Sequence, residues 1–273
     1  MLNKQQQKTL MAKADLKKAD KMFSEKGYEE TNIAAFFDID GTIFRNSLMI
    51  EHFQKLISFE VIDPEVWYTK VKKVYLEWEK RYGDFEEYLE ILAGVYLYEL
   101  KGFDKSYIEY IADHVIKSNG DMIYKYSRNQ IEYHKKQKHK VFFISGSPDF
   151  LVSRMAEKYE ATDYRGSIYK VDSQNKFTGE IVKMWDSESK QRELNNLIKE
   201  YNVDLKNSYA YGDTTGDLSM LKIIGNPIAI NPNRDLLISI REDKELSKKT
   251  TVIVERKNVI YKLDPNVEIL QTI

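Results

Sequence analysis

The chain has 273 residues, which is enough for one large core with an inserted domain or for two ordinary domains. Its 42 Lys and Arg residues nearly balance 43 Asp and Glu residues, so the formal charge of -1 gives no general attraction to nucleic acids or acidic membranes. The absence of cysteine excludes disulfide scaffolds, thiolate zinc sites and cysteine nucleophiles, and is typical of a reducing compartment.

The first thirty residues predict an amphipathic helix. Apolar residues recur at helical spacing from Leu10 to Phe23, and lysines between them leave no continuous apolar stretch of the kind found in secretory signals. No apolar run in the chain approaches the roughly 18 to 20 residues that span a bilayer. We therefore predict a cytoplasmic protein without membrane contact, in which residues 1–30 form a helical extension.

Short apolar runs without alternation predict the strands of a parallel sheet covered on both faces. They occupy residues 33–39, 141–144, 208–211 and 227–230, and a late strand is expected at 251–254. Helical patterns separate the runs, most clearly at residues 149–159 and 189–201. Because strands alternate with helices, we expect an α/β core with right-handed crossovers.

The hundred or so residues between the first two strands read as helices, expected over 64–82, 84–102, 104–120 and 122–138. Aromatic side chains recur there at helical spacing, which predicts that most of them form a hydrophobic core. The simplest account is a helical cap inserted after the first strand. We assign residues 47–127 to the cap, and residues 31–46 together with 128–273 to the core domain.

Two carboxylates follow the first predicted strand, in the sequence Asp38-Ile39-Asp40-Gly41-Thr42. Groups at the carboxyl ends of strands in an open α/β sheet face the binding crevice, and Gly41 allows the chain to turn away sharply. Asp-Gly is also an ordinary turn, so the context of the sheet, rather than the pentapeptide alone, favours a ligand site here.

Ser145-Gly146-Ser147-Pro148 follows the second strand. Ser147 is expected to cap the next helix, with Pro148 at the first helical position. The free amides of the helix start, the small Gly146 and the Ser145 hydroxyl also suit a phosphate group. The capping role and the phosphate role are compatible.

Asp213 and Asp217 follow the third strand, four residues apart. Carboxylates from two strand ends repel one another unless a cation lies between them, and hard oxygen ligands suit Mg²⁺. Magnesium is therefore implied. Lys190 lies near the start of a charged helix, where a lone lysine is usually solvated, so its place in the order of the motifs is what singles it out.

In this order, DIDGT, SGSP, Lys190 and GDTTGD resemble the four motifs of the haloacid dehalogenase superfamily of phosphatases. The resemblance covers the chain from about Asn32 to Asn233. The stretches AYGDTTGDLSML and IGNPIAINPN, together with the helical insertion, are most similar to the phosphoserine-phosphatase-like branch, subfamily IB. This resemblance implies a Rossmann-like α/β core with a parallel sheet and an inserted helical cap of the C1 type.

The resemblance makes Asp38 the nucleophile that attacks phosphorus, and Asp40 the general acid and later the base. It places Mg²⁺ on the Asp38 carboxylate, the Asp40 backbone carbonyl and the Asp213 carboxylate, with Asp217 in support. The groups that would hold the phosphoryl oxygens are Ser145, the Gly146 amide, Thr42 and Lys190. The implied activity is Mg²⁺-dependent hydrolysis of a small phosphorylated metabolite through an aspartyl-phosphate intermediate.

Two departures from the phosphoserine phosphatase pattern limit the inference about substrate. The glutamate that usually receives the substrate ammonium is replaced by Ser47, with Glu51 the nearest substitute, and Ser-Gly-Gly is replaced by Ser-Gly-Ser at Ser147. Phosphoserine is therefore disfavoured. A phosphotransferase that uses the same intermediate and a non-catalytic binding protein with this fold stay open as alternatives, as does the oligomeric state.

Residues 134–140 form a concentrated basic run just before the second strand. The run lies at the edge of the sheet opposite the motifs, so we expect a solvated helix end there and no nucleic-acid contact.

Overall fold

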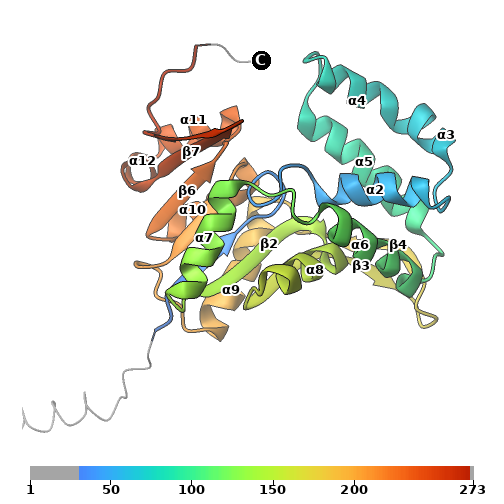
Figure 1. The fold of residues 1–273 in the computed structure, drawn as a ribbon, viewed down its shortest axis with the longest axis horizontal. Helices are drawn as coiled ribbons and strands as arrows, with labels where there is room; N and C mark the ends of the chain where they lie inside the picture. Colours follow the sequence, from blue (N-terminus) through green and yellow to red (C-terminus); the bar gives the residue numbers. More distant parts are fainter. Residues whose placement is uncertain (1–30, 271–273) are drawn as a thin grey trace, which may run out of the picture. The chain divides into compact units, whose positions relative to one another are not determined.

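The computed structural model describes residues 31–270, and the helix predicted over residues 1–30 lies outside the described residues. An eight-stranded sheet with the order β4-β3-β2-β1-β5-β6-β7-β8 organises the described part of the chain (Figure 1). Its strands are β1 (Ala34–Phe37), β2 (Lys140–Pro148), β3 (Asp163–Val171), β4 (Phe177–Val182), β5 (Tyr209–Gly212), β6 (Asn226–Ile230), β7 (Thr251–Arg256) and β8 (Val259–Leu263).

Pairing from β3 to β7 is parallel throughout, whereas β4 and β8 pair antiparallel at the two edges. The predicted α/β class and parallel sheet are thus confirmed. Five of the eight strands coincide with the five apolar runs, while β3, β4 and β8 were not predicted.

The central strand β1 shows why the apolar runs lack alternation. All four of its residues are buried, because β2 and β5 flank it and both faces are covered. Successive side chains point to opposite faces. Phe36 therefore stacks on Phe142 with ring centres 5.0 Å apart in one hydrophobic cluster, and Phe37 stacks on Tyr211 at 4.1 Å in the other.

Helices cover both faces of the sheet (Figure 1). On the face of Phe37 lie α7 (Lys125–Lys136) and α8 (Asp149–Tyr159), the latter with the bounds predicted from sequence. The face of Phe36 packs against α9 (Ser187–Glu200), α10 (Leu218–Ile223), α11 (Arg234–Glu242) and α12 (Lys244–Lys249). A short 3-10 turn, η2 (Thr215–Asp217), precedes α10.

The insertion between β1 and β2 is helical, as predicted. It contains α2 (Leu48–Ser58), α3 (Pro64–Val66), the π-helical segment η1 (Trp67–Val71), α4 (Lys72–Glu79), α5 (Phe85–Leu100) and α6 (Lys105–Asn119). The helix expected over 64–82 is present as continuous helical structure from residue 64 to residue 79, but the π segment within it was not predicted. Asp84 and Asp104 cap α5 and α6 through their carboxylates, which fixes where these helices begin. The proposed boundaries of cap and core stay predictions.

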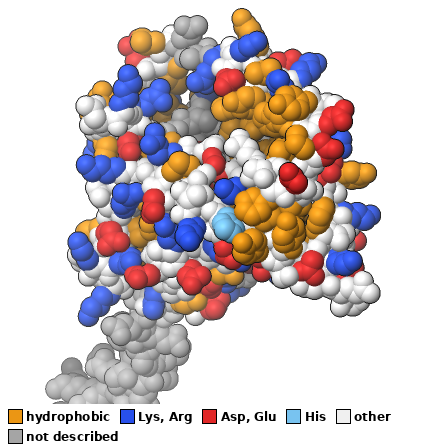
Figure 2. All heavy atoms as spheres, turned by 45° about the vertical axis from the view of Figure 1, so that its right-hand side comes forward, with side chains coloured by type: hydrophobic (Ala, Val, Ile, Leu, Met, Phe, Trp, Pro, Cys, Tyr) orange, Lys and Arg blue, Asp and Glu red, His pale blue; other side chains and the backbone are white. Residues whose placement is uncertain are grey.

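Aromatic residues pack between the helices of the insertion. Trp78 lies against Phe85 and stacks on Tyr88, with ring centres 4.9 and 5.6 Å apart, whereas Tyr82 is exposed. Figure 2 brings the right-hand side of Figure 1 forward and shows hydrophobic side chains gathered in patches on that surface.

Among residues 31–270, no helix combines the length and apolar character needed to span a membrane.

The basic run lies at the amino edge of the sheet, since Lys140 begins β2. His134 is fully buried, with Nε2 2.8 Å from the Tyr211 hydroxyl and Nδ1 2.9 Å from Nδ1 of His139. The prediction of a solvated helix end is therefore wrong for His134, because this residue turns inward onto the sheet. Lys136 is exposed, as predicted.

Candidate active site

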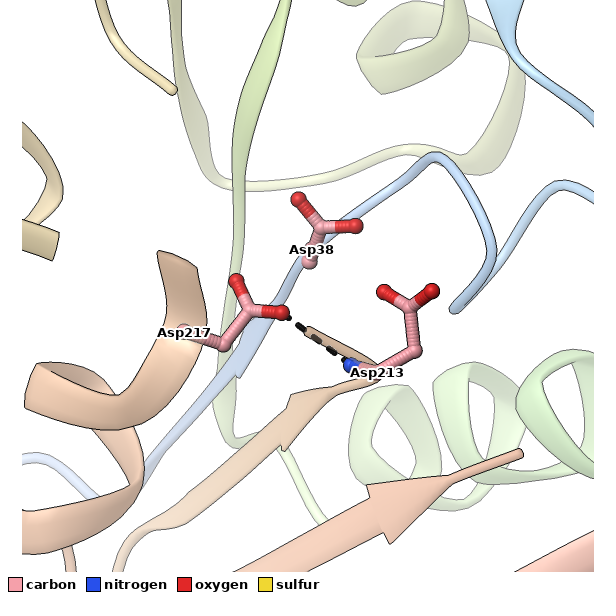
Figure 3. Close-up of side chains that lie close together, drawn as sticks. All are labelled: Asp38, Asp213 and Asp217. Atoms are coloured by element: carbon pink, nitrogen blue, oxygen red, sulfur yellow. Dashed lines mark hydrogen bonds between the residues drawn. The ribbon is translucent and has the colours of Figure 1, made fainter. Parts of the chain in front are cut away.

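Three carboxylates from two neighbouring strand ends converge at the carboxyl edge of the sheet. Asp38 follows β1, Asp213 follows β5, and Asp217 lies in the 3-10 turn that comes next. Each offers an oxygen, and these oxygens lie within 4.8 Å of one another. Figure 3 shows the three side chains directed toward a common space. Within the described range 31–270, this is the group of metal-capable side chains that the fold assembles.

Lys190 connects two of these carboxylates. Its Nζ lies 2.5 Å from Asp38 Oδ1 and 2.6 Å from Asp217 Oδ1, and the side chain is 4% exposed. Helix α9 therefore delivers the lysine into the site, although most of this helix is polar and solvated. Three carboxylates and one ammonium group leave two uncompensated negative charges, which is the charge that a divalent cation neutralises.

The pKa values reflect this crowding of negative charge. Burial raises the pKa of Asp38 to about 8, although the attraction of Lys190 opposes the shift. Removal from water, followed by repulsion from Asp38 and Asp217, raises the pKa of Asp213 well above its ordinary value. Burial lowers the pKa of Lys190, but attraction to Asp217 and Asp38 outweighs burial and keeps the pKa above its usual value. A cation between the carboxylates would favour their ionised forms.

The carboxylate oxygens of Asp38, Asp213 and Asp217 differ in how many hydrogen bonds they already accept. Asp217 Oδ2 accepts from the amide of Asp213 at 3.0 Å (Figure 3). It also accepts from the amide of Thr214 at 3.2 Å, and Asp217 Oδ1 accepts from Lys190. Asp213 Oδ1 accepts from the Thr42 hydroxyl at 3.1 Å. Among the described residues, no hydrogen bond reaches Asp38 Oδ2 or Asp213 Oδ2. These two oxygens are therefore the ones free to bind a cation.

Gly41 makes room for the free oxygen of Asp213. Its φ is +83°, and a Cβ built there would lie 2.0 Å from Asp213 Oδ2. Any other residue would both strain the turn and displace the carboxylate. The all-oxygen donor set, its net charge and this close approach fit a hard divalent cation such as Mg²⁺.

Asp40 stands apart from the three grouped carboxylates. Its Oδ1 accepts from the Leu48 amide at 2.9 Å, and its Oδ2 accepts from the hydroxyls of Ser147 at 2.5 Å and Ser47 at 3.3 Å. Removal from water raises the pKa of Asp40, while the bond from Ser147 opposes the shift. Asp38 and Asp40 thus occupy different environments, as two carboxylates with different roles require.

The predicted helix cap at Ser147 is wrong. The N-cap of α8 is Pro148, without a side-chain cap bond, because the Ser147 hydroxyl is directed to Asp40. The Ser147 amide instead donates to Ser145 Oγ at 3.1 Å. The bond from the Ser147 hydroxyl to Asp40 joins the second sequence motif to the first across the sheet.

The residues predicted to bind phosphate lie at the same edge. Thr42 and Ser145 are fully buried, and the Thr42 hydroxyl is engaged with Asp213. Sequence reasoning did not single out Trp185, which packs against Gly146: a Cβ on this glycine would lie 2.8 Å from Trp185 Cβ. A Cβ on Gly216 would lie 2.8 Å from the Trp185 carbonyl oxygen, so both glycines leave room for Trp185, but a glycine in the sequence does not reveal which residue packs against it.

Glu51, the nearest substitute for an ammonium-binding glutamate, is already engaged. Its Oε1 accepts from Asn46 Nδ2 at 2.7 Å, and its Oε2 accepts from Asn119 Nδ2. The carboxylate thereby joins the segment before α2 to the end of α6. Two neutral amide donors leave its charge uncompensated by any cation among the described residues.

Known proteins share both sequence and fold with this chain. A histidinol-phosphatase of Neisseria meningitidis serogroup C is 23% identical over 207 residues, which cover 74% of this chain and 91% of that protein. A phosphoserine phosphatase of Mycobacterium tuberculosis is 26% identical over 219 residues, covering 77% and 68% of the two chains.

Solved structures show the same fold. A protein of unknown function from Bordetella pertussis Tohama I has a TM-score of 0.64 at 16% identity, covering 82% of this chain and 98% of that one. A phospho-aspartyl intermediate analogue of phosphoserine phosphatase has a TM-score of 0.53 at 21% identity, covering 84% and 95%. Residues 35–222 match the family model of haloacid dehalogenase-like hydrolases. The chain therefore belongs to the haloacid dehalogenase-like hydrolase family, as a phosphatase similar to the phosphoserine phosphatases.

Proposed function

We propose that this phosphatase hydrolyses a small phosphomonoester in a Mg²⁺-dependent reaction that proceeds through a phosphorylated Asp38. The observation that carries the proposal is the pairing of a buried Asp38 with Lys190 beside two further carboxylates, since this arrangement combines a nucleophile with a surplus of negative charge. The class of substrate is supported by two relatives, which are named for histidinol phosphate and phosphoserine. Transfer of the phosphoryl group to an acceptor and binding without catalysis are the alternatives.

The free oxygens of Asp38 and Asp213, with the Asp40 backbone carbonyl, are proposed to hold Mg²⁺. When bound, the cation supplies charge stabilisation to the phosphoryl group as it is transferred. Asp217 fits a supporting role, because its oxygens are taken up by Lys190 and by two backbone amides. It fixes the lysine and the loop that carries Asp213.

Two proton-coupled steps follow from the placement of the two aspartates. In the first, an Asp38 oxygen bonds to phosphorus, the bond from phosphorus to the leaving oxygen breaks, and Asp40 gives that oxygen a proton. In the second, Asp40 takes a proton from water while the water oxygen bonds to phosphorus and the bond to Asp38 breaks. Inorganic phosphate and a free Asp38 result. The phosphoryl oxygens are held by Ser145, the Gly146 amide, Thr42 and Lys190.

The choice of substrate depends on the surroundings of the leaving group. Ser47 lacks the charge that would bind an ammonium group, and the Glu51 carboxylate is held by two asparagine amides. This disfavours phosphoserine and supports a different small phosphorylated metabolite. We also propose a cytoplasmic location, which the absence of cysteine supports, and a cap of residues 47–127 over a core of 31–46 and 128–273.

Hydrolysis of 4-nitrophenyl phosphate tests the function. We expect turnover that EDTA removes and added Mg²⁺ restores, and no turnover by Asp38→Asn. Asp63→Asn is the matched control, because Asp63 caps α3 and asparagine caps equally well. Turnover by Asp38→Asn at the level of the wild type would refute the proposal, as would a lack of turnover by the wild type on a broad panel of phosphomonoesters.

The same assay in the presence of glycerol separates hydrolysis from transfer. Hydrolysis releases one inorganic phosphate for each 4-nitrophenol, whereas transfer yields glycerol phosphate and less inorganic phosphate. We expect hydrolysis, with inorganic phosphate and 4-nitrophenol released in equal amounts.

A further inference from the structure

Two serine hydroxyls at the starts of helices point at one oxygen of Asp40. Ser47 is the N-cap of α2, and Ser147 lies immediately before Pro148, the N-cap of α8. Serine at such positions normally binds a backbone amide of the helix. Neither helix start contains such a side-chain bond, and both hydroxyls donate to Asp40 Oδ2. Both serines therefore bind Asp40 instead of capping the helices that they precede.

The two hydrogen bonds to Asp40 differ in length. Ser147 Oγ lies 2.5 Å from Asp40 Oδ2, within the range of a short hydroxyl-to-carboxylate bond, whereas Ser47 Oγ lies 3.3 Å away, beyond the usual range. Ser147 is also 3% exposed, and its amide donates to Ser145 Oγ. Water therefore competes little for the Ser147 hydroxyl, and its backbone is fixed to the motif expected to bind phosphate.

The chemistry of the two proposed steps places a specific demand on this partner. Asp40 is protonated before the leaving group departs and ionised before water attacks. The Leu48 amide can only donate a hydrogen bond, so it favours the ionised form at Oδ1. A hydroxyl both donates and accepts, and it can remain bonded to the carboxyl group in either state by turning its hydrogen. Glycine or alanine at this position would supply neither bond.

We propose that Ser147 is a positioning residue that holds the Asp40 carboxyl group in its acid and its base forms. The inference rests on the proposed function, since it assigns to Asp40 the proton transfers described above. Ser147 itself exchanges no proton with the substrate. It fixes the direction from which Asp40 delivers its proton to the leaving oxygen, and Ser47 is the weaker second contact.

Dependence on the leaving group distinguishes this role from a structural one. The experiment compares kcat/KM of the wild type, Ser147→Ala, Ser147→Thr and Ser153→Ala on 4-nitrophenyl phosphate and on glycerol phosphate. The value of kcat/KM covers the steps up to departure of the leaving group. Nitrophenolate leaves without a proton, whereas an alkoxide requires one. Ser153 bonds the Phe150 carbonyl within α8 and serves as the control.

We expect Ser147→Ala to lower kcat/KM about 10- to 100-fold on glycerol phosphate and by less than about 3-fold on 4-nitrophenyl phosphate. Ser147→Thr, which keeps the hydroxyl, should restore most of the loss, and Ser153→Ala should match the wild type. Equal losses on both substrates, or no loss on either, would overturn the inference while leaving the proposed function intact. A lack of wild-type turnover on any phosphomonoester would instead overturn the proposed function, and the inference with it.

Protein stability is measured alongside by thermal unfolding. If Ser147→Ala does not fold, Ser147→Cys takes its place, because a thiol keeps much of the volume but donates only weakly. The same difference between the two substrates is then expected, and its absence would be equally decisive against the inference.

Discussion

Acid should destabilise the helical insertion through His52, a fully buried residue of α2. Its Nε2 lies 3.2 Å from the Ile108 carbonyl oxygen, and its Nδ1 lies 2.6 Å from the Tyr96 hydroxyl. A carbonyl oxygen only accepts, so Nε2 carries the ring proton and Nδ1 accepts from the tyrosine. The neutral ring thus satisfies both partners and joins α2 to α5 and α6. A second proton on the ring would occupy the acceptor at Nδ1.

The sign of the effect follows from the shift in the pKa of His52. Burial lowers this pKa from 6.5 to about 3 in the folded protein, while the histidine of the unfolded chain keeps the ordinary value. Between these values the unfolded chain binds a proton and the folded protein does not. The stabilisation is therefore fully present above pH 6.5 and is lost as the pH falls toward 3. At pH 5 the loss is about 2 kcal/mol.

Urea unfolding at pH 7.5 and pH 5 measures this loss, with His52→Gln as the comparison, because glutamine keeps a donor and an acceptor but does not titrate here. Between the two pH values, the wild type should lose about 2 kcal/mol more than the variant. The raised pKa values of Asp38 and Asp213 act in the opposite direction, but they are common to both proteins and cancel in the difference. Equal losses in the two proteins would refute the reasoning.

Three further predictions concern the carboxylate group. Gly41→Ala would place a Cβ 2.0 Å from Asp213 Oδ2 at a φ of +83°. Calorimetric titration should therefore show that the affinity for Mg²⁺ falls at least about 10-fold. Gly94→Ala is the control and should leave the affinity unchanged, because its Cβ would meet nothing within 4 Å. Lys190→Met removes the ammonium beside Asp38 and should lower kcat about 100-fold or more in steady-state assays. Mg²⁺ at about 100 times its Kd should stabilise the wild type by about 2.7 kcal/mol in thermal scans, a gain that Asp213→Asn should largely abolish.

The meeting of Asp38 with Asp213 could be predicted because it depends on topology more than on side-chain detail. Both residues follow buried apolar runs, and buried parallel strands present their carboxyl ends at one edge. The register confirms the pairing of these runs, since Phe37 lies opposite Tyr211 two residues before Asp213. A sequence that fixes the direction and burial of two strands therefore also fixes where the residues after them meet.

Strands β3 and β4 were not predicted because their stability comes from pairing with neighbouring strands. In β3 and β4, buried and exposed residues are mixed, and charged side chains such as Arg165, Lys170 and Glu180 interrupt the apolar pattern. Across the pair, Lys170 and Glu180 form an ion pair at 2.9 Å. Such a contact stabilises a strand only once the partner strand is present, so no pattern within either segment predicts it.

The π-helical segment was missed for a related reason. Residues 64–79 show a continuous helical pattern, but Trp67 packs on Tyr75 and approaches Phe53 of α2, with ring centres 5.2 and 6.5 Å apart. The widened turn at η1 occurs where tertiary packing brings these large rings together. Sequence periodicity predicts which residues face inward, but it does not predict how much room the partner helix leaves.

Ser147 shows how a local rule yields to a distant partner. A serine cap contributes about 1 kcal/mol to a helix. A carboxylate withdrawn from water and left without donors costs more, about 1 to 3 kcal/mol for each missing bond and above that for a charged acceptor. The hydroxyl therefore turns from α8 to Asp40, 107 residues away in the chain. Local signals identify the serine, whereas the identity of its partner depends on which polar group the fold leaves with the greatest need of a donor.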